Sequence, residues 1–166
     1  EFVALGEKAK AEGKYLLCYS TKYGQEYFYN YWFNPLVCSI DINAFGKLQR
    51  LEENAYSDPA VREALERTKM LIDLGYVDTV SGTLEITETQ MEFCKGNVVF
   101  YPCGSWLEAE MEGNWPEDFE LTYMPFPPNK KGDPSYLAVA GVVSAVSATT
   151  KNEDIVKEYY RYMLSH

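Results

Sequence analysis

The residues that could do chemistry gather in residues 97–106, where an apolar run ends at Pro102 and a turn leads to Trp106. Cys103-Gly104-Ser105-Trp106 is superficially similar to a cysteine-protease signature, but that signature needs a nucleophilic Cys directly before the aromatic residue, where this chain has Ser105. It also needs a histidine base, and the sole histidine, His166, ends the chain. A serine nucleophile at Ser105 lacks both the G-x-S-x-G turn and that base. The stretch therefore predicts no nucleophilic enzyme.

Carboxylates are the second group with possible chemistry. A glycosidase needs two of them held close across a sugar bond. Glu108 and Glu112 are spaced i, i+4 and would share a helix face, although such a face is more often simply a solvated acidic surface. A glycan-active hydrolase with paired carboxylates and aromatic platforms is therefore the alternative function. No glycine-rich phosphate loop and no Cys/His spacing typical of a metal site is present, so we expect neither a cofactor nor a metal.

Aromatic rings are the most unusual feature of the composition, with 14 Tyr, 8 Phe and 3 Trp. A flat ring can bury the apolar C–H face of a sugar, while polar tips bond its hydroxyl groups. Trp106 can face a cleft because it follows an expected strand, and open α/β sheets bind ligands at that end of their strands. The other candidates are Trp32 and a cluster of Tyr23, Tyr27, Phe28, Tyr29 and Tyr31. For most of that cluster we favour packing of a helix on the sheet.

Charge and length narrow the class of protein further. The 166 residues correspond to about one domain, and 15 basic against 25 acidic side chains give a net charge of −10. Such a chain is a poor candidate for binding nucleic acid or anionic membranes. No apolar run is long enough to cross a bilayer. The chain begins at Glu1 within a helical pattern, without a signal peptide, which predicts a segment excised from a longer protein.

The pattern along the chain predicts helices alternating with strands that are far apart in sequence. We expect helices at 2–14, 26–39 (bent at Pro35), 58–75, 87–96, 105–112 and from residue 150 onward. We expect strands at 15–19, 97–102, 119–124 and 136–146, and a loop at 41–57. This order predicts a layered α/β domain, with helices on a small, incomplete mixed sheet.

Three of these helices carry specific signals. Asp58 suits the N-cap of the third helix, Pro59 its first position and Gly75 its end. A face of Val61, Leu65, Thr68 and Ile72 is predicted to be apolar. Capping boxes are expected at residues 87–90 and 150–153, and Ile155, Tyr159 and Met163 would share a face of the last helix.

The four cysteines have no spacing that predicts a framework of bridges. Cys18 and Cys38 lie in apolar runs, which favours buried thiols. Whether Cys94 and Cys103 pair is left open.

Six segments together resemble the carbohydrate-binding extracellular solute-binding proteins of bacterial ABC importers, the family that includes maltose-binding protein. Each segment is weak alone, but all six follow the order of that family over nearly the whole chain. They are Leu5-Gly6-Glu7-Lys8-Ala9-Lys10-Ala11-Glu12-Gly13-Lys14; residues 58–64 leading into 71–77; residues 88–96; Gly104-Ser105-Trp106; Met124-Pro125-Phe126-Pro127; and residues 143–152.

The resemblance implies that residues 1–166 form one α/β lobe of the periplasmic-binding-protein-like type II fold, the C-terminal lobe of two that close on a sugar. It implies a binding protein and not an enzyme, outside the cell and lipid-anchored or periplasmic, with a membrane permease as partner. Ligand contacts would come first from Trp106 and Tyr27. Glu26, Tyr23, Ser105 and Gly104 would be further contacts, and Gly141 would lie where the chain crosses back to the other lobe.

Overall fold

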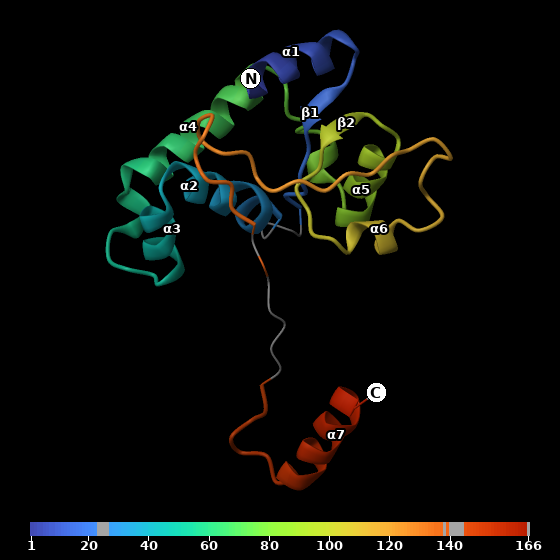
Figure 1. The fold of residues 1–166 in the computed structure, drawn as a ribbon. Helices are drawn as coiled ribbons and strands as arrows, with labels where there is room; N and C mark the ends of the chain where they lie inside the picture. The colour runs from blue at the N-terminus through green and yellow to red at the C-terminus, as the bar shows by residue number, and fades with distance from the viewer. Residues whose placement is uncertain (23–26, 138, 140–144, 166) are drawn as a thin grey trace.

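The computed structural model describes residues 1–22, 27–137, 139 and 145–165 (Figure 1). In the element order below, η marks a π-helical or 3-10-helical segment. The order is α1 (Phe2–Ala11), β1 (Tyr15–Leu17), η1 (Tyr27–Phe33), α2 (Asn34–Ile40), α3 (Ile42–Gln49), η2 (Ala55–Ser57), α4 (Pro59–Asp73), η3 (Ser81–Thr83), α5 (Ile86–Cys94), β2 (Val98–Phe100), α6 (Leu107–Glu110) and α7 (Glu153–Ser165).

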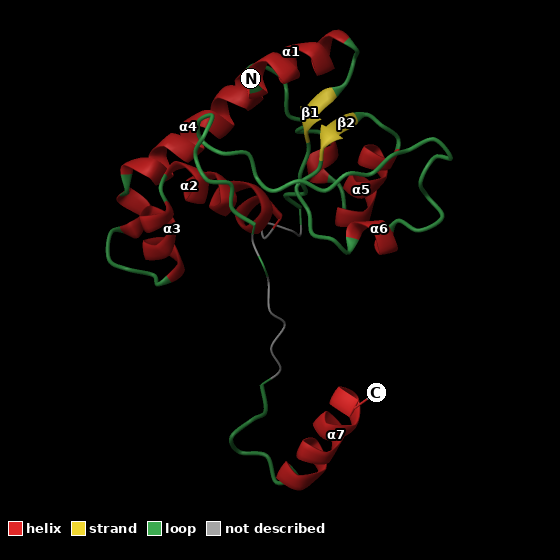
Figure 2. Ribbon diagram, viewed as in Figure 1, coloured by secondary structure: helices red, strands yellow, loops and turns green. Residues whose placement is uncertain are grey.

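The two described strands form a parallel pair, drawn in yellow in Figure 2. Tyr15 lies opposite Val98 and Leu17 opposite Phe100. Leu17 also forms an isolated parallel bridge to Val77, so a third segment runs alongside β1. The expected α/β class is therefore confirmed, although the described pairing is purely parallel where a mixed sheet was expected. Parallel pairing follows from the helices that connect these segments.

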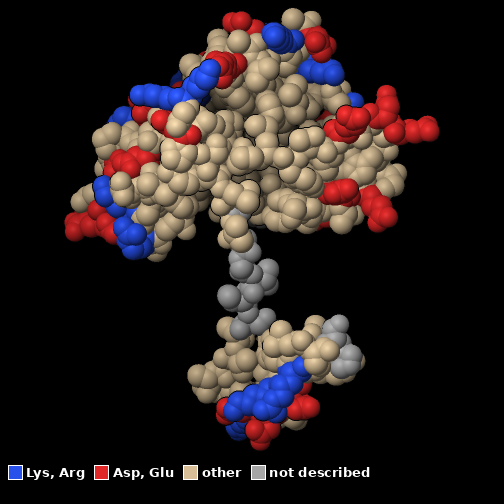
Figure 3. Space-filling view, in the orientation of Figure 1, with Lys and Arg blue, Asp and Glu red and all other residues tan. Residues whose placement is uncertain are grey.

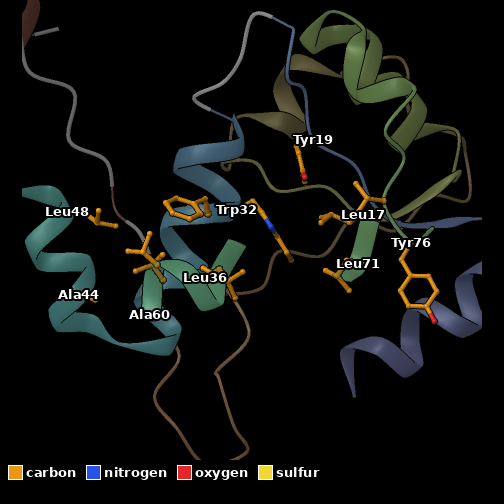
Figure 4. Packing of buried hydrophobic residues seen from close by; sticks show 14 of the residues in the cluster. Leu17, Tyr19, Trp32, Leu36, Ala44, Leu48, Ala60, Leu71 and Tyr76 are labelled. Carbon is orange, nitrogen blue, oxygen red and sulfur yellow. The ribbon is translucent and has the colours of Figure 1, made fainter. Parts of the chain in front are cut away.

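Helices cover both faces of this pair (Figure 1). One buried cluster joins Leu16 and Leu17 of β1 to side chains of η1, α2, α3 and α4, and α1 packs against it. Trp32 lies near its middle, between Leu36 and Leu17 in the view of Figure 4. A second, smaller cluster joins Cys18 and Val98 to α5 and α6. The sheet is thus the middle layer of three, which is the layered arrangement that the sequence predicts.

Helix α4 begins where the sequence predicts, but its buried face is turned from the predicted one. Asp58 Oδ1 accepts the Ala60 N–H at 3.1 Å, Pro59 opens the helix and Gly75 follows it with φ 72°. Leu65 and Ile72 of the predicted face are exposed. The residues that this helix buries are Ala60, Val61, Ala64, Thr68 and Leu71. Small residues lie at the core because α2 packs closely on this helix.

The prediction of a loop at 41–57 is wrong. Asp41 caps α3, its Oδ1 accepting the Asn43 N–H at 2.8 Å, and η2 follows. Ala44 and Leu48, spaced i, i+4, bury one face of α3 in the first cluster. The polar majority of this segment forms the solvated face of an amphipathic helix.

Two further helix predictions are corrected in detail. The reciprocal cap of α5 uses Glu85 and Glu88, whose Oε2 accepts the Glu85 N–H at 3.0 Å, so the N-cap lies two residues before the predicted one at Thr87. Residues 27–40 are helical as expected, but in two parts. Pro35 lies in the first turn of α2, where a missing N–H costs nothing.

The predicted strand at 119–124 is absent: these residues have no regular secondary structure. Phe119 packs on Phe93 of α5 at a ring-centroid distance of 5.5 Å, so its apolar side chain serves the second cluster without strand pairing. The expected helix at 105–112 is shorter, and α6 ends at Glu110. The predicted strand at 136–146 falls mostly outside the described residues.

Helix α7 buries none of its residues. Ile155, Tyr159 and Met163, predicted to share a face, are all exposed, and Figure 1 shows α7 apart from the other elements. No described helix is long and apolar enough to cross a membrane.

A buried hydrogen bond in the first cluster allows a stability test. The Trp32 indole N–H donates to Thr68 Oγ1 at 3.0 Å, and that hydroxyl donates to the Ala64 carbonyl at 2.8 Å. Thr68→Val should lower the free energy of unfolding by about 1–3 kcal/mol, because it leaves the buried indole N–H without an acceptor. Urea unfolding measures the loss.

Thr68→Ser is the matched control, because it keeps the hydroxyl. The Trp32 indole N–H resonance should move in Thr68→Val and stay near its original position in Thr68→Ser. A Thr68→Val chain as stable as the original, with an unmoved resonance, would contradict this bond.

Candidate functional site

The candidate site lies at one edge of the sheet, because parallel strands bring their carboxyl ends together. The segment after β2 runs from Tyr101 to Trp106, and Asp78 follows the bridge at Val77 on the other side of β1. The aromatic helix η1 packs beside the turn after β2. The ring centroids of Tyr31 and Trp106 are 5.5 Å apart at an interplanar angle of 66°. In open α/β sheets this edge is where ligands bind.

Trp106 is the last residue of the turn before α6. The Leu107 N–H donates to the Gly104 carbonyl at 3.2 Å and closes the turn, while Leu107 itself is buried in the second cluster. The Trp106 side chain is 38 % exposed. One part of the ring is therefore held against the protein while the remainder meets solvent, which is the arrangement a stacking platform requires.

Tyr27 lies behind Trp106 in the protein. It is buried, and its ring contacts Tyr31 edge-on at a centroid distance of 5.2 Å. Burial raises the pKa of Tyr27 to about 12, and the neighbouring Cys103 adds to that effect. A hydrogen bond from the Trp106 side chain to the Tyr27 hydroxyl opposes it. The Tyr27 hydroxyl is thus occupied within the protein, by the same side chain that forms the exposed platform.

A group of polar side chains connects Tyr27 to α5 and α6. The Cys103 thiol accepts hydrogen bonds from the side chains of Tyr27 and Gln90, and burial raises the pKa of Cys103 to about 11. Gln90 is only 1 % exposed, and its Nε2 donates to Glu110 Oε2 at 2.7 Å. In the sequence Gln90 is the last residue of the predicted capping box at 87–90, and that position does not predict this role. A buried amide one helix away from a turn gives no sequence signal.

Tyr101 completes the floor of this edge and was also missed. Its hydroxyl bonds to Thr89 Oγ1 at 2.9 Å, and its ring stacks on Phe93 at 5.9 Å. Burial raises the pKa of Tyr101 well above its usual range. In the sequence Tyr101 is only part of an apolar run. Its place directly after β2, at the edge of the sheet, is the one feature that marks it as a site residue.

Ser105 and Tyr123 fix the outer side of the turn. The Tyr123 hydroxyl donates to the Ser105 carbonyl at 3.2 Å and accepts the Glu108 N–H at 3.3 Å. Ser105 itself is exposed beside Trp106, and Gly104 is half-buried. Tyr123 was expected in a strand, and its role here depends on a loop that folds back over α6.

A shallow pocket of about 350 Å³ lies next to this turn. It is lined by Ser105, Glu108, Ala109, Glu112 and Trp115. Glu108 and Glu112 therefore share one surface, as their spacing predicts, although α6 ends between them. The face drawn in Figure 3 shows acidic groups, without basic ones among them, around the region of α6 and the loop after it. The pocket is open, acidic and bounded by one aromatic ring.

The remaining candidate residues divide into core residues, residues at the edge of the sheet and residues that the structure does not describe. Trp32, at 5 % exposure, is a core residue and no platform, as its bond to Thr68 requires. Phe28 packs on Phe33 and on Tyr19, which follows β1, so the packing interpretation is confirmed for Phe28. Tyr29 contacts Phe28 and Phe33 of its own helix and is 45 % exposed, which the packing interpretation does not predict. Tyr23, Glu26 and Gly141 lie outside the described residues. Trp106, Tyr27, Ser105 and Gly104 come together at the edge and remain predicted ligand contacts.

The cysteines are all free thiols, and three of them, Cys18, Cys38 and Cys94, are buried. Cys103 and Cys94 are therefore not paired. Among the described residues no group of three or more His, Cys, Asp or Glu side chains is placed to hold a metal ion.

Comparison with known proteins finds a similarity in sequence to a binding protein. No family model and no solved structure matches the chain. The chain is 29 % identical over 181 aligned positions to the diacetylchitobiose binding protein NgcE of Streptomyces coelicolor. The alignment covers 99 % of this chain but 36 % of that protein. The chain is thus a distant homologue, along nearly its whole length, of part of a binding protein.

The burial of the thiols gives a test by chemical labelling. A pKa of about 11 in place of 9.0 lowers the thiolate fraction of Cys103 at pH 8 about 100-fold, and only the thiolate reacts with a disulfide reagent. Cys103 of the folded chain, followed by mass spectrometry of its peptide, should therefore react with such a reagent at pH 8 about 100-fold more slowly than Cys103 of the urea-unfolded chain. Equal rates would contradict the buried arrangement.

The same thiols should make the folded state less stable in alkali. Their folded pKa values lie above the unfolded value of 9.0, at about 11 for Cys103 and about 12 for Cys18, so the unfolded chain releases these protons first. The free energy of unfolding should stay level below pH 9 and fall as the pH rises from 9 towards 11 and 12. Urea unfolding in reducing buffer at pH 7.5, 9 and 10.5 measures this fall, and a rise would contradict it.

Proposed function

We propose that this chain is the C-terminal lobe of a two-lobe solute-binding protein of the periplasmic-binding-protein-like type II fold. It captures a neutral, N-acetylated disaccharide such as diacetylchitobiose outside the cell, for delivery to the membrane permease of an ABC importer. One observation carries the proposal: the half-exposed indole of Trp106 stands at the carboxyl edge of the sheet, in a chain that aligns almost completely with a diacetylchitobiose binding protein.

Trp106 is the main contact in this proposal. Its exposed face would stack on the apolar C–H face of one sugar ring, and the Ser105 hydroxyl beside it would bond a sugar hydroxyl. The acidic surface around α6 disfavours an anionic ligand, because it would repel a carboxylate or phosphate group. An acetylated amino sugar carries no charge and fits this condition.

Tyr27 has a supporting part in the same proposal. Its hydroxyl is engaged with Trp106 and Cys103, so it holds the platform and offers a sugar at most its ring edge. Gly104 forms the turn below the platform. Tyr23 and Glu26 precede η1 in sequence and are proposed as contacts from the loop that enters it.

The platform alone forms one wall of a site. In a two-lobe protein a sugar bound between the lobes favours the closed state by its higher affinity for that state. The chain spans 36 % of the length of its relative, and the opposite wall would come from the remainder of such a protein. We therefore expect this chain by itself to bind the sugar weakly, in the millimolar range.

A glycan-active hydrolase remains the second candidate because Glu108 and Glu112 line one pocket beside Ser105. Most glycoside hydrolases cleave with a pair of carboxyl groups, and an aromatic ring nearby could hold the sugar. The distant homologue is a binding protein, which favours capture over cleavage.

Titration of the ¹⁵N-labelled chain with diacetylchitobiose tests the proposal. Each of the three tryptophans gives one indole N–H signal, and Trp106→Phe identifies that of Trp106. We expect the sugar to move the Trp106 signal and to leave those of Trp32 and Trp115 in place. Backbone amide signals of the turn 103–107 report binding in variants without Trp106. Trp106→Ala should weaken the binding measured there about tenfold or more, because the stacking surface is lost.

Tyr56→Ala is the matched control, since it removes another exposed aromatic ring, in η2. It should leave sugar binding unchanged. Release of the monosaccharide N-acetylglucosamine from diacetylchitobiose, lost in Glu108→Gln, would support the hydrolase. No movement of the Trp106 signal at 20-fold molar excess and millimolar sugar would contradict a platform at this residue.

A further inference from the structure

We propose that Gly104 is the positioning residue of the Trp106 platform: the absence of a side chain at 104 lets the indole fold back over the turn, and any larger residue would turn the ring out of its place. The expected loss of sugar affinity rests on the proposed function. The position of the Trp106 ring over Gly104, which we call the seat of the ring, does not depend on any ligand.

The contact between the two residues is direct. A Cβ atom built on Gly104 would overlap three atoms of the Trp106 ring, Cζ3, Cη2 and Cε3. These atoms form the benzo edge of the indole, so the ring lies over the Gly104 backbone. Because the overlap is with a side chain two residues away, the space at 104 is used by the ring itself.

The ring has little freedom to yield. Tyr31 contacts it edge-on at 5.5 Å, and its N–H is bonded to Tyr27, which is itself buried. The turn beneath is closed by the bond from the Leu107 N–H to the Gly104 carbonyl. A methyl group at 104 must therefore rotate the indole and break its contacts with η1.

The backbone does not need a glycine at 104. Gly96 and Gly113 have φ angles of 75° and 79°, which favour glycine, and an added Cβ would meet nothing within 4 Å at either position. At Gly104 both conditions are the opposite. Its φ is not positive, and an added Cβ would collide with the Trp106 ring. Alanine can therefore adopt the backbone at 104 without strain, and the effect of the substitution falls on Trp106.

Gly104→Ala tests the inference by two separate readouts on the folded chain. The indole N–H signal of Trp106 should move, while the signals of Trp32 and Trp115 keep their positions. The affinity for diacetylchitobiose should fall about tenfold, and Gly104→Ala added to Trp106→Ala should lower it no further, because the glycine acts through the ring.

Gly46→Ala is the matched control. It is the same substitution in α3, where the nearest atoms to an added Cβ would be those of the Arg50 guanidinium, from 3.1 Å, at the end of a flexible side chain. It should move none of the three indole signals and leave the affinity unchanged.

The outcomes separate this inference from the proposed function. An unmoved Trp106 signal in Gly104→Ala, or an additive loss of affinity in the double variant, would overturn the inference. A moved signal in a chain that binds no sugar would support the seat of the ring and contradict the proposed ligand. A chain that loses all three signals would have lost its fold, which contradicts the expectation that alanine fits the backbone.

Discussion

The parallel pairing of β1 with β2 is the constraint on which the rest of this structure depends. Tyr15 and Leu17 lie opposite Val98 and Phe100, about 80 residues later in the chain, and every element between them must connect two strands that point the same way. The connection therefore crosses over in helices that cover the faces of the sheet. It also brings the segment after β2 to the same edge as the segment after β1. Without that pairing, Trp106 and the aromatic helix η1 would have no reason to meet.

Trp32 and Trp106 show how the layers of the fold decide whether an aromatic ring is buried in the core or exposed at the edge of the sheet. Trp32 in η1 lies within the first cluster, and Thr68 of α4 satisfies its N–H. Trp106 lies at the open edge, and its N–H is satisfied by Tyr27. Both indoles have a partner for their polar atom, as buried or partly buried tryptophans require. What differs is whether a layer of helices covers the ring.

A chain of hydrogen-bonded polar side chains connects Tyr27, the partner of Trp106, to α5 and α6. Gln90, Cys103 and Glu110 come from α5, the turn and α6, and each satisfies another's hydrogen-bonding group. Gln90 is buried and Cys103 half-buried, and an unpaired polar group there would be costly, so these bonds hold both side chains in one arrangement, while Glu110 is the exposed end of the network. The network reaches Trp106 through Tyr27, which bonds to both Cys103 and Trp106.

The amino-acid sequence by itself determined the features that depend on neighbours along the chain. Asp58 and Pro59 start α4, Gly75 follows its end, and the run 97–102 contains the strand β2. The tertiary structure decided everything that depends on neighbours in space. It made residues 42–49 helical because Ala44 and Leu48 pack into the first cluster, left 119–124 without a strand partner, and turned Leu65 and Ile72 outward. It also separated Trp106 from Trp32. The physical reason is that capping and periodicity are local properties, whereas burial is set by the element that arrives from elsewhere in the chain.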